Sequence, residues 1–304
     1  MKIHLIFAAA LLTLAACNNE NITIVDNPDT PVEIRLSSGI EVQTRATTDI
    51  QGTAFDTDEK VDVFISEAVA GGQSATTTYE QPLTYTAGTN GALNIAEDSQ
   101  PYFPSSGNGV NIYAVYPSGA HSKTTFSIKS DQSTDADYKA SDLMYGTAEN
   151  PVSRTKSAVP ITFKHLLSKV TVKLVAGNGL TDTGLEGAKV ELLGVKPDVP
   201  FTASDGTIGT AEGTATDVTV FTATSSALEG SAVIAPQTLP EEFVRVTLKD
   251  GGVLTGKLND SSQPALTSGN EYTYTIIVNL TSLAMTASIT PWNPNTSEGN
   301  AGMQ

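Results

Sequence analysis

The chain has 304 residues, enough for two ordinary domains, and 39% of them are hydrophobic, so it can bury a core. Charged residues make up only 16% and aromatic residues 6%, which is unlike a coiled coil or helical bundle and typical of a Thr-, Val- and Gly-rich all-β protein. The net charge of −16 disfavours binding to nucleic acid or to anionic lipid. A single cysteine excludes an intramolecular disulfide, and three scattered histidines exclude a histidine-based metal cluster.

The first 16 residues have the layout of a secretory signal peptide. Lys2 gives a basic start, and the apolar run from Ile3 to Leu14 is shorter than the roughly 18 residues of a membrane-spanning helix. The run ends at Leu14-Ala15-Ala16-Cys17, which resembles the lipobox of bacterial lipoproteins. We therefore expect acyl chains such as palmitate on Cys17, since two chains anchor a protein stably. A plain signal peptide with a chance cysteine is the alternative.

A polar tether and one early strand are expected next. Residues 18–31 are rich in Asn, Asp and Pro, which is typical of a flexible linker. Val32, Ile34 and Leu36 alternate with charged residues, which predicts a half-buried strand. Arg45 follows in a polar, turn-prone stretch and offers a trypsin-like protease one obvious site; the alternative is an ordinary solvated loop arginine.

The rest of the chain alternates strand patterns with turn residues. Short segments rich in Val, Ile and Thr are separated by Gly, Pro, Asn and Asp, which predicts sandwiches or barrels, and helical periodicity is nearly absent. The stretch 149–157 shows no regular spacing of apolar residues, and we expect the domain boundary there. The expected strands are 61–65, 110–116, 125–128, 159–163, 169–175, 189–195, 218–222, 232–235, 243–248, 253–258, 272–280 and 285–289.

Candidate chemistry is sparse. No serine lies in a nucleophile-elbow pattern and no glycine-rich loop suits a phosphate. Asp56, Asp58 and Glu59 lack the remaining ligands and the glycine of an EF-hand calcium loop. His165 is expected to be a packed structural histidine, and Trp292 to plug the end of a sandwich rather than stack on sugar. The sequence therefore predicts a protein that is not an enzyme and has no metal or cofactor site.

Several segments spread along nearly the whole chain resemble the fimbrillin family of Bacteroidales, the pilins and minor subunits of type V pili, and they follow one another in the order expected for that family. The most specific is the stretch from Ile161 to Val170. The others are the lipobox at Cys17, Thr44-Arg45-Ala46, Ile112-Tyr113-Ala114-Val115-Tyr116-Pro117, Asp142-Leu143-Met144-Tyr145-Gly146, Gly269-Asn270-Glu271-Tyr272-Thr273-Tyr274 and Ile289-Thr290-Pro291-Trp292.

The strand pattern and the resemblance together predict an all-β chain with two tandem β-sandwich domains. The resemblance adds a transthyretin-like type, Greek-key connections and little helix. The expected division is a lipoprotein signal peptide at 1–16, a tether and removable N-terminal strand at 17–45, an N-terminal domain at 46–156 and a C-terminal domain at 157–304.

The resemblance also implies how such a subunit is processed. The precursor is exported as a lipoprotein to the outer membrane, and an Arg-specific protease cuts between Arg45 and Ala46. Val32, Ile34 and Leu36 fill a groove before that cut, and a strand of another pilin subunit fills it afterwards, by main-chain pairing. The expected location is a fimbria on the cell surface, and the expected adhesion ligand is a glycan or protein on a host or bacterial surface.

The tail after Trp292 departs from the pattern of a stalk pilin. It has no apolar alternation, so it is poorly suited to donate a strand. This favours a tip or accessory subunit. The alternative function is an outer-membrane-anchored glycan-binding lipoprotein of a nutrient-uptake system, although a single Trp argues against sugar stacking. A surface hydrolase is a third class, and no nucleophile or pair of carboxylates stands out for it.

Overall fold

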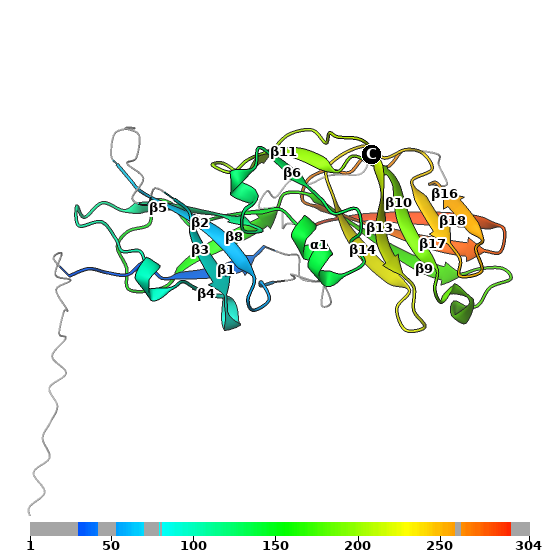
Figure 1. Ribbon diagram of the computed structural model, residues 1–304, viewed down its shortest axis with the longest axis horizontal. Helices are drawn as coiled ribbons and strands as arrows, with labels where there is room; N and C mark the ends of the chain where they lie inside the picture. Colours follow the sequence, from blue (N-terminus) through cyan, green and yellow to red (C-terminus); the bar gives the residue numbers. More distant parts are fainter. Residues whose placement is uncertain (1–29, 42–52, 70–78, 80, 259–262, 293–304) are drawn as a thin grey trace, which may run out of the picture. The chain divides into compact units, whose positions relative to one another are not determined.

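The computed structural model describes residues 30–41, 53–69, 79, 81–258 and 263–292, and strands dominate this part of the chain (Figure 1). The all-β prediction is confirmed. The α-helix of the described part is α1 (Asp135–Ser141), whose first turn is capped by the Thr134 side chain. No described helix is long and apolar enough to cross a membrane. Short 3-10 turns are η1 (Thr89–Gly91), η2 (Glu97–Ser99), η3 (Ala120–Ser122) and η4 (Asp182–Leu185).

Seven strands in the first half of the chain close into a barrel. Their hydrogen-bonded order is β1 (Leu36–Ile40), β4 (Ala92–Asn94), β3 (Leu83–Ala87), β2 (Lys60–Glu67), β5 (Val110–Tyr116), β7 (Met144–Thr147) and β8 (Val159–His165). Side chains alternate between the core and the outside, as on β8, where Val159, Ile161 and Phe163 are buried and their neighbours exposed. The structure has a barrel here instead of the predicted sandwich, because β1 pairs with both β4 and β8 and so closes the sheet.

Eight strands in the second half form two packed sheets (Figure 1). The first sheet runs β13 (Thr216–Thr222), β10 (Lys189–Val195), β15 (Val244–Thr247), β16 (Val253–Gly256). The second runs β14 (Glu229–Ile234), β9 (Ser168–Ala176), β17 (Asn270–Asn279), β18 (Ser282–Pro291). Their inner faces share one apolar core, in which the rings of Phe243 and Tyr274 meet edge to face at 4.9 Å.

A small third sheet joins strands from either side of the expected domain boundary. β6 (Thr125–Ser127) pairs with β11 (Asp198–Thr202), which pairs with β12 (Thr207–Ile208). By sheet membership the chain passes from barrel to sandwich between β8 and β9, because β8 completes the barrel. The described residues from Pro31 onward group into one compact unit. The division into domains at residues 156 and 157 stays a prediction.

The segment before α1 closes one open side of the sandwich. Gln132 is buried, and its side-chain amide donates to the Val233 carbonyl on β14 (2.9 Å) and accepts from the Val233 N–H (2.8 Å). The backbone N–H of Gln132 donates to the Thr219 carbonyl on β13 (2.9 Å), and the Thr219 N–H donates to Ser130 (2.8 Å). Each edge strand on this side is therefore hydrogen-bonded at one residue, Thr219 on β13 and Val233 on β14, which hinders unwanted strand pairing there.

One buried carboxylate holds the turn that follows β5. Asp62 on β2 accepts hydrogen bonds from the Gly119 N–H (2.6 Å), the Ser118 hydroxyl (2.8 Å) and the Thr84 hydroxyl (2.9 Å), and its Oδ2 lies 2.7 Å from His121 Nδ1. Burial raises the pKa of Asp62, but these hydrogen bonds together outweigh burial and lower that pKa below its ordinary value. The ionised form is thus the one that stabilises the barrel.

We predict that Asp62→Asn lowers the free energy of unfolding by about 1–3 kcal/mol near neutral pH. A carboxyl with a lowered folded-state pKa contributes stability above its unfolded pKa and loses it as pH falls through the folded value. The gap between wild type and variant should therefore narrow as pH falls below the ordinary value of 3.8. Urea unfolding at a series of pH values measures it, and a gap that stays constant down to about pH 2 would contradict the assignment.

We also predict that Gln132→Met lowers the free energy of unfolding by at least about 2 kcal/mol, because two buried backbone groups of Val233 lose their partners. Gln237→Met is the matched control. Gln237 makes the same pair of bonds to the Lys196 backbone (2.9 and 3.0 Å), but at an exposed site, where water replaces them. Equal losses in urea unfolding would show that burial of the Val233 edge is not the cause.

Candidate functional site

Residues 31–41, called here the N-terminal segment, supply one wall of the barrel. Val32, Ile34, Leu36 and Ile40 are all buried in the barrel core, and Ile34 is 0% exposed. Between them, Glu33 and Arg35 form an outward ion pair at 3.0 Å. The predicted alternation of buried and outward residues is therefore present over 32–36, although the regular strand β1 begins only at Leu36.

The N-terminal segment is hydrogen-bonded to β8 along one side. β1 runs parallel to β8, with Leu36 opposite Val159 and Ile40 opposite Phe163. The Val159 N–H donates to the Arg35 carbonyl at 2.8 Å, which extends the pairing beyond β1. Parallel partners cannot be joined by a tight hairpin, so this contact requires two stretches that are remote in the sequence.

A different part of the chain holds the other side of the segment. The Ile34 N–H donates to the Pro101 carbonyl (2.8 Å), and the Phe103 N–H donates to the Val32 carbonyl (2.9 Å). Further along, the turn η1 lies against Ser38, where Gly91 has a φ of 73° and an added Cβ would lie 2.5 Å from the Ser38 carbonyl oxygen. The segment is thus inserted between two neighbours, and its removal would leave two rows of unpaired backbone groups.

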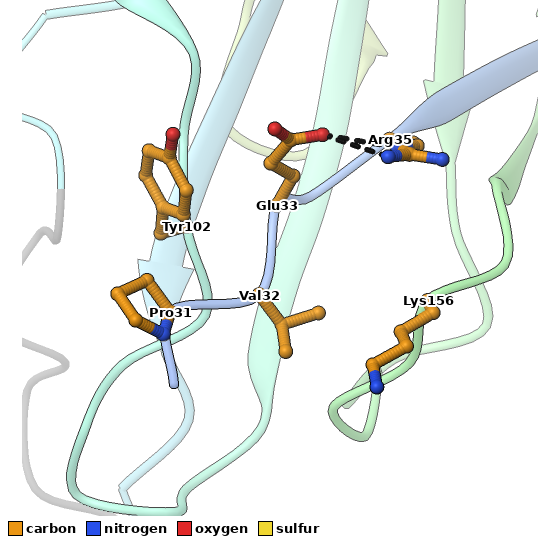
Figure 2. A pocket seen from close by; sticks show the side chains of 6 residues that line it. All are labelled: Pro31, Val32, Glu33, Arg35, Tyr102 and Lys156. Atoms are coloured by element: carbon orange, nitrogen blue, oxygen red, sulfur yellow. Dashed lines mark hydrogen bonds and ion pairs between the residues drawn. The ribbon is translucent and has the colours of Figure 1, made fainter. Parts of the chain in front are cut away.

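A hollow of about 470 Å³ lies beside the N-terminal segment. Figure 2 shows its lining, with Glu33 between Tyr102 and Arg35; the lining residues are Pro31, Val32, Glu33, Arg35, Tyr102 and Lys156. Tyr102 is 42% exposed, and its N–H donates to the Tyr79 hydroxyl at 2.8 Å. Burial raises the pKa of Tyr79, which keeps that hydroxyl protonated. Four of the six lining residues belong to the segment, so the hollow depends on its presence.

The other predicted processing residues lie outside the described part of the chain. Cys17, Arg45 and Ala46 fall there, so lipidation and cleavage stay predictions. Within the described ranges, no three His, Cys, Asp or Glu side chains gather as a metal site requires. The acidic residues weighed as a calcium loop are engaged otherwise: Asp56 and Glu59 both pair with the Lys139 ammonium, Glu59 at 3.2 Å.

His165 is a packed structural histidine, as predicted. Its side chain is fully buried, Nδ1 lies 2.9 Å from the Asp142 carboxylate, and its ring stacks on Trp292 with centroids 3.6 Å apart and planes 11° apart. Trp292 is buried, so this ring face serves packing rather than sugar stacking. Sequence reasoning missed Asp142 as the partner of His165. The sequence feature that could have indicated it is a carboxylate directly before two apolar residues, Leu143 and Met144, which are both fully buried.

An aromatic row on the barrel also escaped sequence reasoning. Phe64 on β2 stacks on Tyr113 of β5 (4.5 Å between centroids), which faces Tyr145 of β7 at 5.9 Å. The Tyr145 hydroxyl donates to the Ser204 carbonyl (3.2 Å), and burial raises the pKa of Tyr145 to about 12. Because these rings face one another across the strands, they offer a sugar few free ring faces.

We predict that Ile34→Ala lowers the free energy of unfolding of the intact chain by about 2–5 kcal/mol, since it leaves a cavity in the barrel core. Arg35→Ala is the matched control on the same segment, and we expect a change within about 0.5 kcal/mol because Arg35 is exposed. Chemical denaturation measures both. Similar values for the two variants would mean that the N-terminal segment is not packed as an integral wall.

Comparisons with known proteins identify the family by a family model and show the same fold in solved structures. A family model described as fimbrillin-like matches residues 44–292. A candidate cell adhesion protein from Bacteroides ovatus superposes with a TM-score of 0.69 at 20% identity, covering 88% of this chain and 99% of that one. A similar protein from Bacteroides uniformis gives 0.64 at 20% identity, covering 86% and 99%. The C-terminally truncated tip fimbrial protein Mfa3 from Porphyromonas gingivalis gives 0.50 at 10% identity, covering 86% and 100%. No curated protein matches the chain.

Proposed function

Because the chain belongs to the fimbrillin-like family, we propose that it is a structural and adhesive subunit of a fimbria at the cell surface, assembled with other pilin subunits by strand exchange. The observation that carries the proposal is the N-terminal segment. It buries its apolar side chains in the barrel and hydrogen-bonds to neighbours on both sides. In the sequence, however, it precedes all the other strands of the barrel. A separate strand in that place is replaceable by a strand of the same pattern.

The proposed processing uses residues that flank this segment. Cys17 carries the lipid that holds the precursor on the outer membrane. An Arg-specific protease hydrolyses the Arg45–Ala46 peptide bond, which separates the segment from the body and from the lipid. The family match supports this position, since the matched residues begin at Thr44, after β1. The vacated groove beside β8 then accepts another subunit's strand.

A tip or accessory position is proposed over a stalk position. The last described strand, β18, pairs with β17 at ten successive positions from Asn270–Pro291 to Asn279–Ser282, so it is an integral part of its own sheet. The sequence after Trp292 lacks the apolar alternation of a donor strand. The chain accepts a strand in this proposal and does not donate one.

The second candidate function is the glycan-binding lipoprotein. The hollow beside Tyr102 favours it, because this exposed ring stands next to charged and polar side chains. It requires the N-terminal segment and the lipid to be retained, since the segment lines the hollow. The buried Trp292 and the mutually stacked aromatic row do not support it.

We predict that limited trypsin treatment of the purified precursor cuts after Arg45 and that the cut protein binds a peptide copied from the C-terminal strand of a stalk pilin. Intact mass identifies the cut and fluorescence anisotropy measures binding. Arg45→Ala is the control and should be neither cut there nor able to bind. A cut protein that unfolds, or an uncut protein that binds polysaccharide while the cut form binds no strand, would favour the glycan-binding function instead.

We predict that Cys17→Ser moves the precursor out of the membrane fraction, because the acyl chains require the thiol. Cell fractionation with labelled palmitate measures both location and acylation. An unchanged distribution in the Cys17→Ser variant would contradict the lipoprotein proposal and would leave the strand-exchange proposal standing.

A further inference from the structure

The four edge strands of the sandwich are protected very unequally. On one side, residues 130–132 hydrogen-bond to β13 at Thr219 and to β14 at Val233, as described above. On the other side, β16 has only four residues and is followed by Lys257, a charge of the kind that discourages edge pairing. β18 next to it (Figure 1) has ten residues, no charged side chain, no register shift, and proline only at its last position. Within the described residues no strand pairs with its outer edge.

The alternation of backbone groups shows which part of β18 is available. On β17, Val278 directs its carbonyl to Gly177 at the end of β9 (2.9 Å), so the residues next to Val278 in the sequence direct their groups to β18. The even-numbered residues of β18 therefore point their N–H and C=O groups back at β17. The odd-numbered residues direct theirs to the free edge; they are Leu283, Met285, Ala287 and Ile289.

The inward row of β18 is covered along only half of its length. Leu283 and Met285 pack over Gly256 of β16, where an added Cβ would lie 3.0 Å and 3.2 Å from their side chains. Ala287 and Ile289 continue the same row and are exposed, Ile289 by 63%. The second half of the strand thus offers both an open edge and uncovered apolar surface.

We propose that β18 is a self-pairing edge, on which a second copy of this chain docks through its own β18, antiparallel, about a two-fold axis at Thr286. In this register Leu283 meets Ile289 of the second copy, and Met285 meets Ala287 of the second copy. Ser282 likewise meets Thr290 of the second copy. The odd-numbered row therefore pairs apolar side chains with apolar ones, and the even-numbered row pairs hydroxyls with hydroxyls except where Ala284 meets Ser288 of the second copy.

Side-chain pairing and symmetry both select a second copy as the occupant. The net charge of −16 opposes the association of two copies, but β18 adds no like charge to the contact because it carries no charged side chain. A two-fold pairing uses the same patch on both copies and closes on itself. It also places each Ile289 beside Leu283 of the second copy, which packs against β16 on the inner face of that copy's sheet. The pairing needs neither cleavage nor release of the N-terminal segment, so it is independent of the proposed function.

Cysteine cross-linking tests the register. In the full chain with Cys17→Ser, Thr286→Cys introduces the only thiol. At the axis, two such residues form a non-hydrogen-bonded pair with Cα atoms about 4.5 Å apart, within the range of a disulfide. We expect a disulfide-linked dimer under mild oxidation. Ser282→Cys and Thr290→Cys should not cross-link alone but should do so when mixed.

Sedimentation equilibrium of the full chain tests the association itself. We expect a concentration-dependent monomer–dimer equilibrium whose Kd rises at least about tenfold in Ile289→Lys, which places two charges in the interface. Val69→Lys is the matched control: Val69 is also an exposed apolar residue, but it lies beyond β2 of the barrel, and the Kd should not change.

Three outcomes would overturn the proposal. The first is a wild-type chain that stays monomeric at all concentrations while Thr286→Cys fails to cross-link. The second is cross-linking of Ser282→Cys alone as fast as Thr286→Cys, which excludes the two-fold register. The third is a dimer that forms only after residues 293–304 are deleted, which would make this chain's own tail the occupant of the edge.

Discussion

The parallel pairing of β1 with β8 is the contact on which the first half of the molecule depends. It joins residues 36–40 to residues 159–163 and turns a row of seven antiparallel-paired strands into a closed barrel. Closure places Ile34, Leu36 and Ile40 in one core with Phe163 and removes the free edges that an open sheet would expose. The same contact makes the closure conditional, because β1 precedes the other strands in the chain, and after a cut at Arg45 only packing and hydrogen bonds would hold it to them.

The two halves of the chain treat their sheet edges in opposite ways. Among the described strands the barrel has no free edge while the N-terminal segment is in place, and losing that segment would create a groove whose shape is set by the segment. The sandwich instead has strand edges on two sides. A glutamine side chain and a short backbone stretch cover one of them, and the other holds the long, uncharged β18. Both proposed attachment sites for another chain therefore lie at strand edges, the vacated groove of the barrel and β18 of the sandwich, which fits a fimbrillin-like protein.

Local patterns predicted many strands well and their partners poorly. β5 (Val110–Tyr116) and β10 (Lys189–Val195) match the predicted bounds, because apolar alternation is flanked by turn residues. β7 was missed because Gly146 weakens its strand signal, yet Gly146 is required where Ile161 and Phe163 press against it. β11 was missed because it contains Pro200. Barrel closure, the Asp142–His165 pair and the Gln132 cover depend on contacts between remote residues, which a single sequence does not reveal. At the candidate site, the buried positions 32, 34 and 36 followed from alternation, and the parallel partner did not.

Hydrogen–deuterium exchange of the precursor before and after cleavage at Arg45 tests most directly whether the N-terminal segment is a separable wall of the barrel. If it is, cleavage followed by removal of the segment raises the exchange of amides that face it, such as those of Val159 and Phe103, to near that of exposed backbone. Amides in β9, β10 and β17 of the sandwich then keep their protection. A uniform loss of protection across barrel and sandwich, or no change at Val159 and Phe103 after the segment has gone, would contradict this view of the barrel.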